Sequence, residues 1–244
     1  MRVRAFLLTL LLAGTATADD SVLIAVASNF AGVAETLAIS FRAETGIEVA
    51  VSRGSTGKLY SQVVNGAPFD ALLAADEERP RMLEESGLAV AGSRFTYATG
   101  SLVLWSRTAS DCLAALQDEG GGRVALANPD IAPYGRAAKQ YLESIDAWRG
   151  VSSRAVFGQN ILQVLQIAST GNVDLALVAR AHANLPHLSH GTCSVEVPTT
   201  SHAPIVQQAV LLDAGNDSAR RFLEYLRSDD ARALIRRAGY EVPR

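Results

Sequence analysis

Short apolar runs and helical patterns alternate along most of this chain, and the alternation predicts its fold class. Residues 22–27 form an apolar run that predicts a buried strand. In residues 30–44, apolar side chains then recur at helical spacing, at Phe30, Val33, Leu37 and Phe41. The pattern continues with expected strands at 47–51 and 69–74 and expected helices at 58–64 and 77–86. Strands that alternate with helices are typical of an α/β fold with largely parallel sheets.

Two longer apolar runs divide the chain into two lobes. Residues 97–106 and 205–213 are each long enough to form a strand that leaves one lobe and enters the other. Between them we expect strands at 123–127 and 173–178, helices at 136–145 and 162–169, and a long irregular loop at 182–200. Helices at 219–227 and 231–238 complete the chain, the last ended by Gly239. We predict lobe one from residues 19–98 and 206–244, lobe two from residues 99–205, and two crossovers between them.

Small polar clusters follow four of the apolar runs, and a helical pattern begins directly after each. The clusters are Ser28-Asn29, Gly54-Ser55-Thr56-Gly57, Pro133-Tyr134-Gly135 and Gln159-Asn160-Ile161. A helix start leaves backbone N–H groups unpaired and carries the positive end of the helix dipole. The carboxyl ends of strands are also where open α/β sheets place their ligands. Four such starts, with the Tyr134 hydroxyl as a further donor, would bind an oxyanion without a cationic side chain.

Basic side chains flank these clusters, at Arg53, Lys58, Arg94 and Arg136. They could add positive charge to an anion site, but exposed ion pairs are the commoner use of such residues.

The first residues have the pattern of an export signal. Arg2 and Arg4 precede an apolar stretch at 5–13, and Ala16-Thr17-Ala18 is a small-residue cleavage site. We expect residues 1–18 to be removed and the mature protein to be periplasmic. No later stretch approaches the roughly 20 apolar residues that span a bilayer.

The charge balance excludes some partners. The whole chain has a formal net charge of −3, and without Arg2 and Arg4 it has 20 basic against 25 acidic residues. Nucleic acids and anionic membrane surfaces require a basic surface, so we expect neither as a partner. A small anion in a closed cleft responds to local dipoles, so the net charge does not exclude it.

The chain has two cysteines, Cys112 and Cys193. An oxidising compartment favours a disulfide between them, with two free buried thiols as the alternative. His182, His187 and His190 precede Cys193 at a spacing that could bind zinc or copper, but the segment is predicted as a solvated loop.

Enzyme motifs are few. Gly54-Ser55-Thr56-Gly57-Lys58 is not a P-loop, because Leu59 stands where a serine or threonine is needed. The chain has neither a G-x-S-x-G nor an H-E-x-x-H motif. We therefore expect a binding protein, with a hydrolase that uses a serine and one of the four histidines as the alternative.

The order of several motifs resembles the periplasmic molybdate-binding proteins, the substrate receptors of molybdate ABC importers. The shared segments are Val26-Ala27-Ser28-Asn29-Phe30, Gly54-Ser55-Thr56-Gly57, Asn65-Gly66-Ala67-Pro68-Phe69-Asp70, Ala74-Ala75-Asp76, Ser93-Arg94-Phe95-Thr96-Tyr97, Leu102-Val103-Leu104-Trp105-Ser106, Ile131-Ala132-Pro133-Tyr134-Gly135 and Pro204-Ile205-Val206-Gln207-Gln208-Ala209-Val210. They span essentially the whole mature chain.

The resemblance implies a two-lobed, type II periplasmic-binding-protein fold that closes on one molybdate or tungstate ion, without a cofactor. Ser28 and Thr56 would then offer hydroxyl and backbone N–H donors, with Asn29 beside them and an N–H of Ala75 near the hinge. Tyr134 and the backbone N–H of Ile161 would donate hydrogen bonds from lobe two. One branch of the family has a tyrosine ligand where this chain has Ala179, and here the phenol of Tyr134 would replace it.

The resemblance also implies a monomeric receptor that delivers its ion to a membrane permease. Sulfate, phosphate or another oxyanion is the alternative ligand within the same class. The proposed ligands are hydrogen-bond donors, which suits a fully deprotonated dianion better than protonated phosphate.

Overall fold

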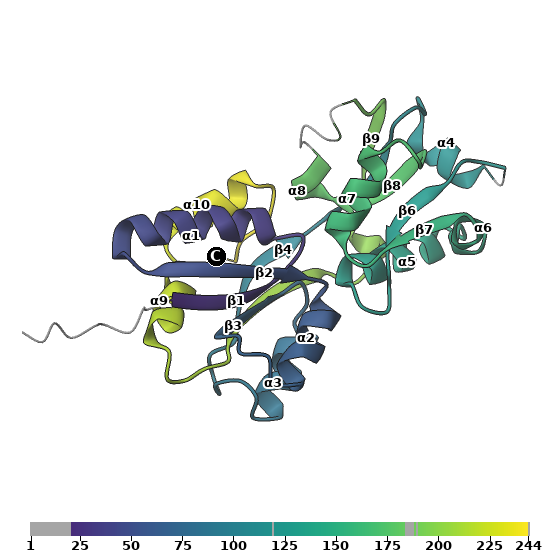
Figure 1. Cartoon of the computed structure of the whole chain (residues 1–244). Helices are drawn as coiled ribbons and strands as arrows, with labels where there is room; N and C mark the ends of the chain where they lie inside the picture. The colour runs from purple at the N-terminus through teal and green to yellow at the C-terminus, as the bar shows by residue number, and fades with distance from the viewer. Residues whose placement is uncertain (1–20, 119, 184–187, 189, 244) are drawn as a thin grey trace, which may run out of the picture.

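The computed structural model describes residues 21–118, 120–183, 188 and 190–243, and it folds into two lobes (Figure 1). Each lobe is built on one five-stranded sheet with helices packed against it. The predicted α/β, two-lobed architecture is confirmed. The predicted export signal at 1–18 lies outside the described residues, within which no helix is long and apolar enough to cross a membrane.

The sheet of lobe one has the strand order β2-β1-β3-β10-β4. Its strands are β1 (Ser21–Ala27), β2 (Glu48–Gly54), β3 (Ala71–Ala74), β4 (Phe95–Gly100) and β10 (Ile205–Leu211). β1 is parallel to both β2 and β3, whereas β10 is antiparallel to β3 and β4. The helices of this lobe are α1 (Ala31–Thr45), α2 (Thr56–Val64), α3 (Glu78–Glu85), α9 (Asp217–Tyr225) and α10 (Asp229–Arg237).

The sheet of lobe two repeats this plan with the order β7-β6-β8-β5-β9. Its strands are β5 (Leu102–Ser106), β6 (Val124–Ala127), β7 (Ala155–Gly158), β8 (Leu175–Ala179) and β9 (Cys193–Glu196). β6 is parallel to β7 and β8, and β5 is antiparallel to β8 and β9. Its helices are α4 (Cys112–Gln117), α5 (Pro133–Ser144), α6 (Trp148–Ser153), α7 (Ile161–Ser169) and α8 (Arg180–Ala183).

Two connections join the lobes. The chain leaves the first sheet at Gly100, enters the second at Leu102, and returns between β9 and β10. The single long strand predicted at 97–106 is therefore wrong: Ser101 interrupts it, because β4 and β5 pair in different sheets. Buried side chains form one apolar cluster in lobe two and two in lobe one, so each lobe has its own core.

Other predictions from the sequence are corrected by pairing partners that lie far away in the chain. β7 and β9 were not predicted as strands, because four residues with mixed burial carry almost no periodic signal. β9 lies inside the segment expected to be an irregular loop, and residues 184–187 and 189 of that segment lie outside the described residues. The last helix begins at Asp229, two residues before the predicted start, and is capped by Ser228, whose Oγ accepts a hydrogen bond from the N–H of Ala231 (3.2 Å).

A disulfide joins Cys112 and Cys193, with their Cα atoms 5.9 Å apart. It links the first residue of α4 to the first residue of β9. Cys193 therefore lies in a strand rather than in a loop, and its sulfur is not available as a thiolate ligand. His187 lies outside the described residues, among which no cluster of histidine, cysteine, aspartate or glutamate could hold a metal ion.

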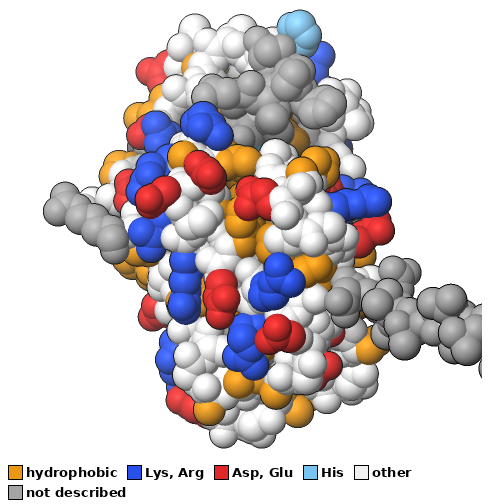
Figure 2. All heavy atoms as spheres, turned by 90° about the vertical axis from the view of Figure 1, so that its left-hand side faces the viewer, with side chains coloured by type: hydrophobic (Ala, Val, Ile, Leu, Met, Phe, Trp, Pro, Cys, Tyr) orange, Lys and Arg blue, Asp and Glu red, His pale blue; other side chains and the backbone are white. Residues whose placement is uncertain are grey.

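Charged side chains of both signs are interspersed over the face of the molecule that Figure 2 shows. No continuous basic surface is visible on this face, in keeping with the net charge of −3.

Candidate anion-binding site

The four polar clusters converge on one small cavity between the lobes. Its lining residues are Ala27, Ser28, Asn29, Gly54, Ser55, Thr56, Ala75, Ala132, Pro133, Tyr134, Asn160 and Ile161. All five residues predicted to bind the ligand are among them: Ser28, Asn29, Thr56, Tyr134 and Ile161. The cavity volume is about 10 Å³, which is too small for an organic ligand.

The start of α2 contributes two hydroxyl groups from lobe one. Thr56 Oγ1 accepts a hydrogen bond from the N–H of Ala75 (3.0 Å), which leaves its own O–H to donate elsewhere. Ala75 was expected to donate to the anion, but its N–H is used here to orient Thr56. Ser55 precedes the helix, yet its side chain makes no capping hydrogen bond, and its buried Oγ has no partner.

Ser55 also lines the cavity with a hydroxyl, but it was not predicted from the sequence to bind the ligand. Its position directly before a helix was the available signal. A serine there usually accepts a hydrogen bond from the first turn of the helix. Because Ser55 does not, its hydroxyl can donate to a ligand.

The turn after β1 contributes Ser28 and Asn29. Ser28 was expected to donate its backbone N–H, but that N–H bonds to the carbonyl oxygen of Gly54 (2.9 Å), so only its hydroxyl is available. The Asn29 side chain points away toward the hinge and donates to Gln207 Oε1 (2.7 Å). Within the described residues, the backbone N–H of Asn29 has no hydrogen-bond partner and stays the donor of this residue.

The starts of α5 and α7 contribute main-chain donors from lobe two. Pro133 is the first residue of α5, so the N–H of Tyr134 belongs to the unpaired first turn. Ile161 is the first residue of α7, and Asn160 caps that helix by accepting a hydrogen bond from the N–H of Gln163 (3.0 Å). The cap leaves the N–H of Ile161 unpaired at the cavity.

The phenol of Tyr134 is predicted from the sequence to contact the anion, and in the structure its hydroxyl lies beside Gly100. A Cβ atom built on Gly100 would be only 2.0 Å from the Tyr134 hydroxyl oxygen, and Gly100 is not a lining residue of the cavity. The hydroxyl is buried and has no hydrogen-bond partner in the described part of the chain. The backbone N–H of Tyr134, in the first turn of α5, is a second candidate donor of this residue, and the phenolic contact stays a prediction.

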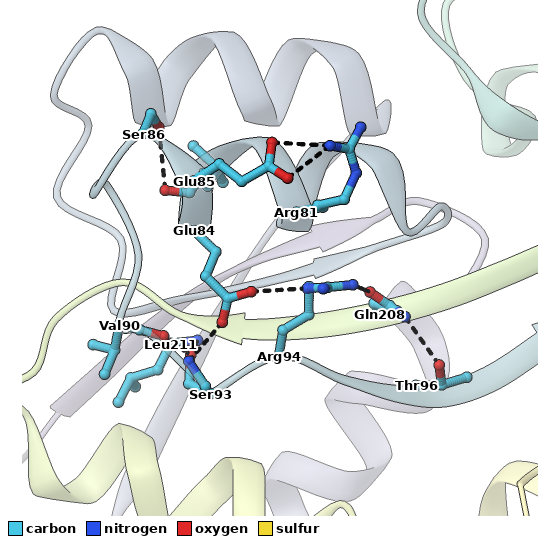
Figure 3. A network of polar contacts seen from close by, with 12 residues as sticks. Arg81, Glu84, Glu85, Ser86, Val90, Ser93, Arg94, Thr96, Gln208 and Leu211 are labelled. Carbon is cyan, nitrogen blue, oxygen red and sulfur yellow. Dashed lines mark hydrogen bonds and ion pairs between the residues drawn. The ribbon is translucent and has the colours of Figure 1, made fainter.

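No charged side chain lines the cavity, so its positive potential comes from the helix starts. The basic residues that flank the clusters lie outside the lining of the small cavity, and three of them contact other side chains. Arg53 lies 3.7 Å from Glu35, and Arg136 donates to Glu78 (2.9 Å), which lowers the pKa of that carboxyl. Figure 3 shows Arg94 between Glu84 and Gln208 in lobe one, where it donates to both side chains. Lys58 does not line the cavity.

Contacts between the lobes close one flank of the cleft. The N–H of Gly57 at the start of α2 donates to the carbonyl oxygen of Ile131 (2.9 Å), and the Arg136–Glu78 ion pair lies on the same flank. On the opposite flank, Nε2 of His182 in α8 lies 3.0 Å from the carbonyl oxygen of Asn29. Burial lowers the pKa of His182, so the neutral ring donates this hydrogen bond.

A much larger cavity of about 760 Å³ adjoins the small one and shares Ser28 and Asn29 with it. Arg53, Arg180, Arg236 and Arg237 line it, together with Glu35 and His182. The three residues with lining hydroxyls and the starts of α2 and α5 meet only at the small cavity, which makes it the candidate anion site despite its size.

Comparisons with known proteins show the family of this chain. The family model described as bacterial extracellular solute-binding protein matches residues 22–241. A molybdate-binding protein of Azotobacter vinelandii is 40% identical over 94% of this chain and 93% of its own length. A molybdate-binding protein of Rhodobacter capsulatus is 36% identical over 91% of this chain and 89% of its own length. Among solved structures, the periplasmic molybdate-binding protein of Azotobacter vinelandii superposes with a TM-score of 0.85 and covers 91% of this chain and 100% of its own.

Proposed function

The chain belongs to the bacterial extracellular solute-binding proteins, and we propose that it is the periplasmic receptor that captures molybdate, and also tungstate, for an ABC importer. The ion binds in the small cavity between the lobes. The receptor then delivers it, as a monomer, to the membrane permease.

One observation carries this proposal. Hydroxyls of Ser28, Ser55 and Thr56 from lobe one meet main-chain N–H groups of Tyr134 and Ile161 from lobe two in a cavity without any charged lining residue. Each lobe supplies only part of the donor set. A bound dianion therefore stabilises the closed arrangement of the lobes over an open one.

The donor set also argues for a fully deprotonated ion. Protonated phosphate needs a hydrogen-bond acceptor, and no aspartate or glutamate lines the cavity. Sulfate has the same charge as molybdate but shorter bonds. A cavity that fits the larger ion leaves some donors beyond about 3.2 Å from the oxygens of sulfate, where hydrogen bonds weaken.

A hydrolase is the alternative from a different class. It would need a histidine within hydrogen-bond distance of Ser28 or Ser55. The described hydrogen bonds of His182 and His202 go to the backbone instead, at Asn29 and Ala203. A catalytic serine is therefore not supported, and we infer stoichiometric capture without turnover.

Calorimetry of the mature protein, started at Asp19, tests the proposal. Molybdate and tungstate should each bind at one site per chain, and sulfate and phosphate at equal concentration should bind far more weakly. The melting temperature should rise in the same order, because a ligand that binds only the folded state stabilises it. Tighter binding of sulfate than of molybdate would make this a sulfate receptor, and release of product from ester or phosphoester substrates would favour the hydrolase.

A further inference from the structure

Tyr134 contributes both to the candidate anion site and to the crossover between the lobes. Its backbone N–H lies in the first turn of α5, at the cavity, whereas its phenol reaches the crossover between the lobes. The side chain is 2% exposed, so the ring fills a closed space.

The end of the phenol lies at both connections between the lobes. Gly100 is the last residue of β4, directly before the chain crosses to lobe two. A Cβ atom on Gly100 would be 2.0 Å from the Tyr134 hydroxyl oxygen, 2.9 Å from Cζ of that ring and 3.2 Å from Nε2 of Gln207. Gln207 belongs to β10, the strand by which the chain returns to lobe one, and its Nε2 is also buried without a partner.

The close contact with Tyr134 requires a glycine at position 100, whereas the backbone conformation at this position does not. Its φ angle does not lie in the left-handed region that favours glycine, unlike those of Gly46 or Gly239. Any side chain at position 100 would instead collide with the Tyr134 hydroxyl. The missing Cβ of Gly100 therefore makes the space that the phenol occupies.

We propose that Tyr134 is a positioning residue for anion binding, because its phenol seats in the space left by Gly100 only when the lobes have the arrangement that brings the N–H groups of α5 to the anion. The inference rests on the proposed function. The phenol and the N–H belong to one residue of a regular helix, so the hinge and the site cannot move independently. The phenol acts as a neutral group, because burial raises its pKa well above the ordinary value.

A double-variant cycle at positions 100 and 134 tests this inference. Gly100→Ala should weaken molybdate binding by about tenfold or more, because overpacking a tight contact costs energy in the closed arrangement. Tyr134→Phe keeps the N–H and removes only the hydroxyl, so its own affinity is the reference against which Gly100→Ala is measured a second time. In the double variant the hydroxyl at 2.0 Å is absent and the nearest atom is the ring carbon at 2.9 Å, which is still a tight contact, so Gly100→Ala should cost less affinity in the Tyr134→Phe protein than in the wild type.

Gly150→Ala is the matched control, because a Cβ atom there meets nothing within 4 Å. This variant should bind like the wild type. Wild-type affinity in Gly100→Ala, or an equal cost of Gly100→Ala in the wild type and in the Tyr134→Phe protein, would overturn the inference. A loss caused only by the backbone at position 100 would not be rescued from position 134.

Failure of the proposed function has a different signature. A wild-type protein that binds no molybdate contradicts that proposal alone. The melting temperatures of the wild type, the two single variants and the double variant without ligand then test the contact between Gly100 and Tyr134. A lower melting temperature in Gly100→Ala that is partly restored in the double variant supports the contact. No decrease in Gly100→Ala, or no recovery in the double variant, overturns it.

Discussion

Lobe one offers the candidate anion cavity three side-chain hydroxyls and the N–H of Asn29, whereas the donors of lobe two are main-chain N–H groups. Ser28, Ser55 and Thr56 supply the hydroxyls, and the starts of α5 and α7 supply the N–H groups. The two halves should therefore respond differently to substitution. A side chain can be removed by mutation, but an N–H stays in place as long as its helix starts at the same residue.

The lobes also differ in how they are held together. Lobe two contains the Cys112–Cys193 disulfide, and no other cysteine occurs in the chain. Replacing both cysteines with alanine should cost up to about 4.5 kcal/mol of unfolding free energy on the chain-entropy model for a separation of 81 residues. Both tryptophans, Trp105 and Trp148, lie in lobe two, so urea unfolding followed by tryptophan fluorescence reports this lobe.

Molybdate affinity of the cysteine-free protein is the control for this first test. The disulfide lies outside the cavity, so at a urea concentration where the protein is folded the dissociation constant should stay within about twofold of the wild type. An unchanged fluorescence midpoint would show that the disulfide does not stabilise lobe two.

Thr56→Ala should give the largest loss of affinity among the hydroxyl variants. It removes a donor to a desolvated dianion, worth roughly 1.5 to 3 kcal/mol, so binding should weaken by about ten- to a hundredfold. It also leaves the buried N–H of Ala75 without its acceptor. Thr56→Ser keeps the hydroxyl and should restore most of the affinity in calorimetry. Equal affinities for alanine and serine at this position would show that the side-chain chemistry of lobe one is not used.

The pH dependence of the unfolding free energy tests the contact that His182 makes between the lobes. Burial lowers its pKa in the folded protein, and its neutral ring donates to Asn29 across the cleft. As pH falls below the unfolded-state pKa of 6.5, the unfolded chain binds a proton that the folded protein does not. The unfolding free energy should therefore fall with decreasing pH, by at most about 1.4 kcal/mol per pH unit from this residue.

Urea unfolding at pH 7.0, 6.0 and 5.5 measures this slope. His182→Gln keeps a donor for Asn29 without a titrating group, so its slope should be smaller than that of the wild type. Arg53, Arg180, Arg236, Arg237 and Glu35 line the same cavity as His182 and are the charged groups that face it. Identical slopes in the two proteins would assign the pH dependence to other groups.

Ile161→Val should have the smallest effect. The anion uses the N–H of this residue, and the Asn160 cap that fixes the helix start is unchanged. Affinity should stay within about twofold of the wild type. Asn160→Ala is the informative partner variant, because losing a helix cap costs about 1 kcal/mol and loosens the turn that presents this N–H. A large loss in Ile161→Val would mean that lobe two also uses side chains.

The two-lobed fold could be predicted from the sequence, whereas the hydrogen bonds of the candidate site could not. Strands followed by polar residues and helices are a local pattern, so the four clusters and the two-lobed plan could be recognised. The role of each polar group depends on distant partners instead. The N–H of Ser28 is used by Gly54, that of Ala75 by Thr56, and the phenol of Tyr134 lies at Gly100. These pairings follow from the tertiary structure, and no local pattern reveals them.

The cavity lined by Arg53, Arg180, Arg236 and Arg237 has a kinetic consequence. This cavity adjoins the candidate anion site and shares Ser28 and Asn29 with it, so we expect an ion to approach the site through it. The chain as a whole carries a net charge of −3, which repels a dianion at long range, whereas the guanidinium groups of this cavity attract one, although Arg53 is paired with Glu35 and Arg180 with Glu196. Dissolved salt screens an approaching ion but acts little on enclosed hydrogen bonds. Raising the ionic strength should therefore slow the arrival of the ion much more than its departure.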